Sequence, residues 1–118
     1  MLPRSQRLRV RRDFRIVYSK GRSLANPWLV LYSRVTKHAD CRIGFSISKK
    51  LGGAVERNRI KRRLREIMRS HSAKLRPGWD VVIVGRSRLQ DADFQAIAQS
   101  VHDLLQRARL LTDAGEKP

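Results

Sequence analysis

Apolar residues recur along the chain with two periods, and the longer period predicts helices. Apolar positions three and four residues apart predict helices over residues 11–20, 54–70 and 91–110. In the middle helix the expected buried stripe is Ile60, Leu64, Ile67 and Met68. In the last helix the expected inward residues are Phe94, Ile97, Ala98, Val101, Leu104 and Leu105. Each helix is therefore predicted to bury one face and to expose the other.

The shorter period predicts strands in the segments between these helices. Alternating residues predict a short strand over residues 23–25 and longer strands over 28–35 and 41–48. The polar segment 36–40 separates the two longer strands, so we expect them to form a hairpin. Residues 79–85 are almost continuously apolar, which predicts a strand that is buried on both faces.

Two of the predicted strands have faces that bear on ligand binding. In the strand over residues 28–35, one face carries Trp28, Val30 and Tyr32. In the strand over residues 41–48, one face is formed by small residues, which are Gly44, Ser46 and Ser48. This small face either leaves a shallow groove for a ligand or packs beneath a helix, and the spacing leaves both interpretations open.

The aromatic residues also allow two interpretations. Phe14 and Tyr18 share one face of the first helix, and Trp28 or Tyr32 from the strand can join them. Aromatic side chains beside cations suit single-stranded nucleic acid, because bases stack on them. Periodicity alone favours the other interpretation, in which these rings belong to a conventional hydrophobic core.

The order of the predicted elements defines the fold class. The predicted order is one helix, three strands, a helix, a strand and a last helix. This order predicts an α+β or α/β two-layer sandwich, in which a small mixed sheet of about four strands packs against about three helices. A chain of 118 residues fits a single domain, which we place at residues 1–118. Within it we expect the tail of residues 112–118 to be frayed.

The charge of the chain is strongly positive and unevenly distributed. The chain holds 27 Lys and Arg against 10 Asp and Glu, yet 41% of its residues are hydrophobic, which excludes a disordered basic tail. Residues 1–22 and 49–65 each carry eight cations and one acid. Such density favours nucleic acid as the partner, because neutralising phosphates releases counterions. No apolar run of about 18 residues is present, so we expect no segment that spans a membrane.

No set of residues predicts catalysis or metal binding by this chain. Cys41 is the only cysteine, so neither an internal disulfide nor a cysteine-based zinc site can form. The three histidines, which share no ligand spacing, are His38, His71 and His102. Gly52-Gly53 lacks the Gly-Lys-Ser/Thr of a phosphate-binding loop. We therefore expect no catalytic residue, no metal ligand and no bound cofactor in the protein itself.

One long segment resembles the signature of a known family. Residues 49–66 read Lys-Lys-Leu-Gly-Gly-Ala-Val-Glu-Arg-Asn-Arg-Ile-Lys-Arg-Arg-Leu-Arg-Glu, with Arg57-Asn58-Arg59 at the centre. Further matches, in chain order, are Asp13-Phe14, Val17-Tyr18, Leu31-Tyr32, Arg42–Ser48 and Asp80–Arg86. Over about residues 4–110 the chain resembles the bacterial ribonuclease P protein component.

The resemblance implies a function that the residues alone do not define. The family is the small protein subunit of a ribonucleoprotein endonuclease, which removes the 5′ leader from precursor tRNA. It implies that a catalytic RNA subunit performs the chemistry and holds the Mg²⁺ ions, while the protein binds the leader and raises the affinity for substrate and metal. The implied partners are that RNA and precursor tRNA, in the cytoplasm, with no membrane and no obligate protein partner. The implied fold contains a left-handed βαβ crossover, against the usual right-handed rule.

The resemblance also assigns residues to two surfaces. The catalytic RNA is expected to contact Arg57, Asn58, Arg59, Lys61, Arg62 and Arg65. The leader is expected to bind in a cleft that is lined or bordered by Phe14, Tyr18, Val30, Tyr32, Ser46, Ser48, Lys49 and Arg86. Without the resemblance, the size, the charge and the α/β character fit a structural RNA-binding protein of the ribosomal type equally well.

Overall fold

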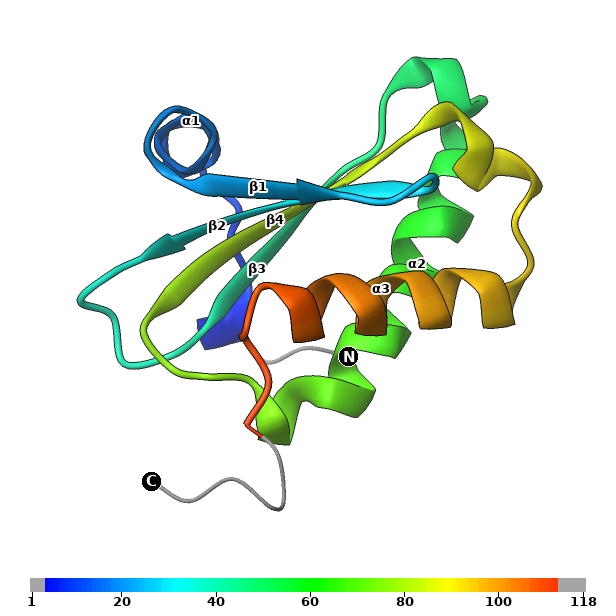
Figure 1. Ribbon diagram of the computed structural model, residues 1–118. Helices are drawn as coiled ribbons and strands as arrows, with labels where there is room; N and C mark the ends of the chain where they lie inside the picture. The colour runs from blue at the N-terminus through cyan, green and yellow to red at the C-terminus, as the bar shows by residue number, and fades with distance from the viewer. Residues whose placement is uncertain (1–3, 113–118) are drawn as a thin grey trace.

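The computed structural model describes residues 4–112 and contains the predicted elements in the predicted order (Figure 1). The helices are α1 (Arg11–Lys20), α2 (Ala54–His71) and α3 (Phe94–Arg107). The strands are β1 (Arg22–Ala25), β2 (Leu29–Val35), β3 (Arg42–Ser46) and β4 (Trp79–Gly85). Short 3-10 helices are η1 (Arg4–Gln6), η2 (Lys49–Leu51), η3 (Ser72–Lys74) and η4 (Ser87–Asp91). The mixed four-stranded sheet with three helices is therefore confirmed, while residues 113–118 of the expected frayed tail lie outside the described residues.

The order of strands in the sheet corrects one prediction. The sheet runs β1-β2-β4-β3, so β2 and β3 do not form the hairpin expected from the polar segment between them. Instead, β2 pairs antiparallel with β1 and with β4, and β3 pairs parallel with β4. The strand that is apolar on both faces, β4, takes a central position because burial there removes the most apolar surface from water. The chain passes from β3 to its parallel neighbour β4 through α2, and the handedness of this crossover stays an expectation.

The two faces of the sheet carry hydrophobic cores of different size. The larger core lies between the sheet and the helices α2 and α3, and its strand residues are Leu29, Leu31, Ile43, Val81 and Ile83. The smaller core lies on the opposite face beneath α1, where Leu8, Val17 and Val82 are buried together. Figure 1 shows the same division, with α1 on one side of the sheet and α2 and α3 on the other. Surfaces carried by α1 and by α2 therefore lie on opposite faces of the sheet.

The register of the strands shows that α1 covers only part of its face. Tyr32, Val82 and Gly44 lie side by side across β2, β4 and β3, and α1 packs on this row. The next row towards the carboxyl ends of β3 and β4 consists of Val30, Val84 and Ser46. All three residues of this second row are only partly buried. We call them the half-exposed row.

An ion-paired cluster fixes the start of α1 relative to the sheet. Asp80 on β4 is buried and accepts two hydrogen bonds from Arg42 on β3, Nε to Oδ1 at 2.8 Å and Nη2 to Oδ2 at 2.7 Å. The Arg42 Nη1 atom also lies 3.6 Å from Asp13 Oδ2 on α1. Because a buried carboxylate is costly unless it is paired, Arg42 must stay beside Asp80, and from there its guanidinium group also pairs with the start of α1.

Two single residues lie where the pattern did not place them. Phe94 is the first residue of α3 and is 44% exposed, so the inward stripe of that helix begins only at Ile97. The helix also starts later than expected, because the Asp93 side chain accepts a hydrogen bond from the Ala96 backbone N–H at 2.8 Å and caps it. Trp28 precedes β2 and packs against the larger core rather than sharing a face with Val30.

Candidate nucleic-acid interface

Three aromatic rings form a cluster between α1 and β2. The rings of Tyr18 and Tyr32 are 4.9 Å apart between centroids and inclined by 79°, and those of Phe14 and Tyr18 are 6.5 Å apart and inclined by 60°. Both are edge-to-face arrangements of the kind that aromatic pairs prefer. Tyr18 is 38% exposed, and the other two rings are partly buried. These rings therefore border the half-exposed row instead of filling a closed core.

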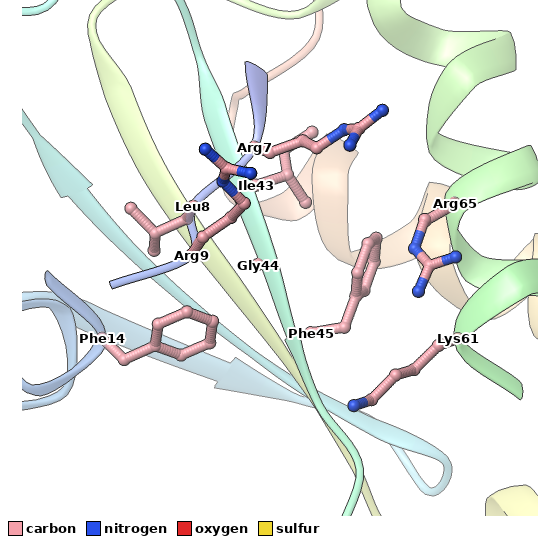
Figure 2. Close-up of a pocket in the computed structure, with 9 residues that line it drawn as sticks. All are labelled: Arg7, Leu8, Arg9, Phe14, Ile43, Gly44, Phe45, Lys61 and Arg65. Carbon is pink, nitrogen blue, oxygen red and sulfur yellow. The ribbon is translucent and has the colours of Figure 1, made fainter. Parts of the chain in front are cut away.

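The small face of β3 contributes to this surface in two ways. A Cβ atom at Gly44 would lie 2.4 Å from Cζ of Phe14, so the ring rests directly on the backbone of the strand. Figure 2 shows the Phe14 ring directed at Gly44. Ser46, two residues further along, belongs to the half-exposed row. One part of the small face thus packs beneath a helix, and the next part stays accessible.

The remaining residues predicted for the leader cleft gather at one edge of the sheet. Because β3 and β4 are parallel, Ser48 and Lys49, which follow β3, and Arg86, which follows β4, lie at the same edge and are exposed. Val30 lies near the start of β2, which is antiparallel and begins at this edge. Arg86 is held there because its Nη1 donates to the Asn26 carbonyl oxygen at 2.9 Å. The structure therefore brings the eight predicted residues to one side and one edge of the sheet.

The basic residues predicted for RNA binding occupy the surface of α2. Asn58, Arg59 and Arg62 are exposed, and the half-buried members of the set are Arg57, Lys61 and Arg65. The residues of the expected stripe, Ile60, Leu64, Ile67 and Met68, are buried as predicted. Within the described part of the chain, none of the five cations forms an ion pair with an acid, and the Arg57 Nε atom is buried without a hydrogen-bond partner. This surface therefore keeps its charge available for an external anion.

A hollow of about 440 Å³ lies beside α2 and was not foreseen from the sequence (Figure 2). Its lining residues are Arg7, Leu8, Arg9, Phe14, Ile43, Gly44, Phe45, Lys61 and Arg65. The N-terminal segment forms one wall, because the Leu8 N–H donates to the Ile43 carbonyl oxygen at 2.9 Å along the outer edge of β3. Alternation of Arg7, Leu8 and Arg9 was the available signal for this extended segment. The hollow joins residues of both predicted surfaces.

The cysteine and two of the histidines, residue types that often serve catalysis or metal binding, have well-defined surroundings in the structure. Cys41 is buried, and desolvation followed by the charges of Asp80 and Asp40 raises the pKa of its thiol to about 12. His71 and His102, distant in sequence, are neighbours, with Nε2 and Nδ1 3.1 Å apart. In residues 4–112 no three metal-ligating side chains lie close enough to hold an ion together.

The fold and these surfaces define a class of protein. One small domain presents three accessible aromatic rings on one face of a sheet, and on the other a basic helix whose five candidate cations form no ion pair among the described residues. Rings provide stacking for bases, and guanidinium groups provide paired donors for phosphate oxygens. No helix among the described residues has the length and apolar character needed to cross a membrane. The molecule belongs to the class of small α+β RNA-binding proteins.

Comparison with known proteins identifies the family within that class. The family model Ribonuclease P matches residues 2–109. The ribonuclease P protein component of Herpetosiphon aurantiacus is 45% identical over 112 residues, which cover 95% of this chain and 91% of the relative. That of Clostridioides difficile is 40% identical over 105 residues, or 88% of this chain and 92% of the relative. The chain therefore belongs to the ribonuclease P protein family, the protein components of a tRNA-processing enzyme with an RNA subunit.

Solved structures agree with this assignment. The ribonuclease P protein of Staphylococcus aureus superimposes with a TM-score of 0.86 at 34% identity, covering 91% of this chain and 98% of that one. The Thermotoga maritima protein gives a TM-score of 0.79 at 34% identity, covering 86% and 96%. The similarity extends over most of the chain.

Proposed function

We propose that this protein binds two RNA molecules through two separate surfaces. The basic surface of α2, formed by Arg57, Asn58, Arg59, Lys61, Arg62 and Arg65, binds the catalytic RNA subunit. The aromatic surface and the adjoining sheet edge bind the single-stranded 5′ leader of precursor tRNA. By holding both RNAs, the protein raises the affinity for substrate and for functional metal ions, and it acts in the cytoplasm without an obligate protein partner.

The observation that carries this proposal is the half-exposed row beside the aromatic cluster. A row of partly buried Val30, Val84 and Ser46 is bordered by aromatic rings and followed by exposed Lys49 and Arg86, so stacking faces and cations lie next to one another. An extended strand of unpaired nucleotides matches that sequence of groups, because its bases need flat partners and its phosphates need cations. A rigid duplex lacks free base faces and does not fit this surface.

The catalytic step is assigned to the RNA subunit. The acidic residues nearest to the aromatic surface, Asp13 and Asp80, both face Arg42, which offsets their charge. The proposal therefore asks these two carboxylates only to hold α1 and the sheet together through Arg42. Mg²⁺ ions held by the RNA would supply the metal chemistry of cleavage, and the residues of this chain bind and position the two RNAs.

Cleavage of precursor tRNA at low Mg²⁺ concentration tests the proposal. The catalytic RNA is assayed with and without the protein, and we expect strong stimulation by the wild-type chain. Absence of stimulation, combined with co-purification of the protein with ribosomal subunits, would instead support a structural RNA-binding role.

Single substitutions test whether the two surfaces are separate. Arg57→Ala is expected to weaken binding of the catalytic RNA more than binding of a leader oligonucleotide, because it removes a phosphate donor from α2 only. Phe14→Ala is expected to do the reverse, because it removes a ring from the aromatic surface. Filter binding with each RNA measures both affinities, and equal losses for both ligands would contradict two separate surfaces.

A further inference from the structure

The hollow between the N-terminal segment, β3 and α2 concentrates cations. Arg7 and Arg9 line it from one side and Lys61 and Arg65 from the other, and no acid lines it among the described residues. Among the described residues Arg9, Lys61 and Arg65 form no ion pair with an acid, so their charge attracts an anion placed in the hollow. The lining therefore favours an anionic occupant.

An aromatic ring lies at the centre of the same hollow. Figure 2 shows the Phe45 side chain directed from β3 towards α2, where Lys61 and Arg65 flank it. Phe45 is only partly buried, although it packs against the larger core. An inorganic anion gains nothing from contact with an aromatic ring. A nucleotide can stack its flat base on the ring and place its phosphate among the cations.

We propose that this hollow binds one unpaired nucleotide of an RNA, with its base stacked on Phe45 and its phosphates contacting the surrounding cations. The inference rests on the proposed RNA-binding function and adds Phe45, Arg7 and Arg9 to the residues assigned there. The nucleotide comes from the leader or from the catalytic RNA, because Phe14 of the aromatic surface and Lys61 of the basic surface both line the hollow. The hollow connects the aromatic surface and the basic surface along the side of β3 that pairs with no other strand of the sheet.

Phe45→Leu removes the ring but keeps an apolar side chain, and Phe94→Leu is the matched control. Phe94 is 44% exposed at the start of α3 and does not line the hollow. A short single-stranded RNA with 2-aminopurine at one position, scanned along its length, forms one arm, and full-length catalytic RNA forms the other. Quenching of 2-aminopurine reports stacking, and filter binding reports the affinity for the catalytic RNA.

We expect Phe45→Leu to weaken binding about tenfold in one arm, which identifies the source of the nucleotide, while Phe94→Leu matches the wild type. Phe45→Trp, which retains a stacking face, should keep the affinity near that of the wild type. Arg9→Gln, a change of an exposed side chain that leaves the core intact, should weaken the same arm and reduce its salt dependence.

The outcomes separate this inference from the proposed function. If Arg57→Ala weakens binding of the catalytic RNA while Phe45→Leu and Arg9→Gln bind like the wild type in both arms, the nucleotide pocket is refuted and the proposed function stands. If the wild-type protein binds neither RNA, the proposed function fails and the pocket fails with it.

Discussion

A methyl group added at Gly44 tests how the aromatic surface is built. In Gly44→Ala the new Cβ would lie 2.4 Å and 2.9 Å from two atoms of the Phe14 ring, and 3.1 Å from the Leu8 carbonyl oxygen. Carbon atoms pack best at about 3.5–4.0 Å, so the ring must retreat by about 1 Å. The Leu8 side of the contact cannot yield easily, because the Leu8 N–H is bonded to Ile43. We expect a loss of about 1–3 kcal/mol in the free energy of unfolding, typical of overpacking.

The same change in a Phe14→Ala background isolates the ring as the cause. Without the ring, the two shortest contacts of the added methyl group disappear and the 3.1 Å approach to the Leu8 oxygen remains, so its cost should fall to about 0.5 kcal/mol. The difference between the two backgrounds is then a coupling energy of about 0.5–2.5 kcal/mol, as expected for residues in direct contact. Urea unfolding followed by circular dichroism measures all four proteins.

Gly53→Ala provides the matched control for this cycle. An added Cβ at Gly53 has no heavy atom within 4 Å, and its φ of −74° suits any residue. Its effect should therefore stay within about 0.5 kcal/mol. If Gly44→Ala costs the same with and without the Phe14 ring, the ring does not rest on the strand as described, and the reasoning is refuted.

Four further outcomes follow from the charges and burial. Asp80→Asn should lower the free energy of unfolding by about 2 kcal/mol in urea titrations, because it breaks a buried pair, whereas Asp103→Asn at the exposed pair with Arg107 should cost under about 0.5 kcal/mol. Ellman's reagent at pH 8 should react with Cys41 about 10³-fold more slowly in the native protein than in urea, because burial raises the pKa of the thiol from 9.0 to about 12; comparable rates would contradict this. Between about pH 9 and 12 the thiol of Cys41 ionises in the unfolded chain but stays neutral in the folded one. The free energy of unfolding should therefore fall as the pH rises through this range, and Cys41→Ala should remove that part of the pH dependence. Binding of the catalytic RNA should weaken by about 10³–10⁵ between about 50 and 200 mM salt if about six phosphates are contacted, and a flat response would contradict the electrostatic account.

The helices were predictable because their signals are local. The stripe of Ile60, Leu64, Ile67 and Met68 defines the buried face of α2 without reference to any other element. The strand β4 was equally clear, since only a central strand buries both faces. The hairpin between β2 and β3 was wrong because strand pairing depends on where the crossover through α2 returns the chain. No polar turn between two strands contains that information.

The candidate surfaces were predictable only in part, for a similar reason. Periodicity favoured a conventional core for Phe14 and Tyr18, and the resemblance to the family placed them in a cleft instead. The sequence did not predict Phe45 as a binding residue, because its exposure depends on a gap between β3 and α2, and these two elements are separate in the sequence. The bridge between Arg7 and Ile43, which brings the N-terminal cations to that gap, joins segments 36 residues apart and leaves no trace in local spacing.

The parallel pairing of β3 with β4, which made the hairpin prediction wrong, also explains how two surfaces on opposite faces can act together. Because β3 and β4 are parallel, the segment that leads from β3 into α2 starts at the edge where β4 ends, so Lys49 and Arg86 lie at the same edge as the first turn of α2. Under the proposed function, the leader on one face and the catalytic RNA on the other approach each other at this edge. Four hydrogen-bonded strands separate the two faces and resist deformation. Under the proposed function, this rigid sheet is what would fix the position of one RNA relative to the other.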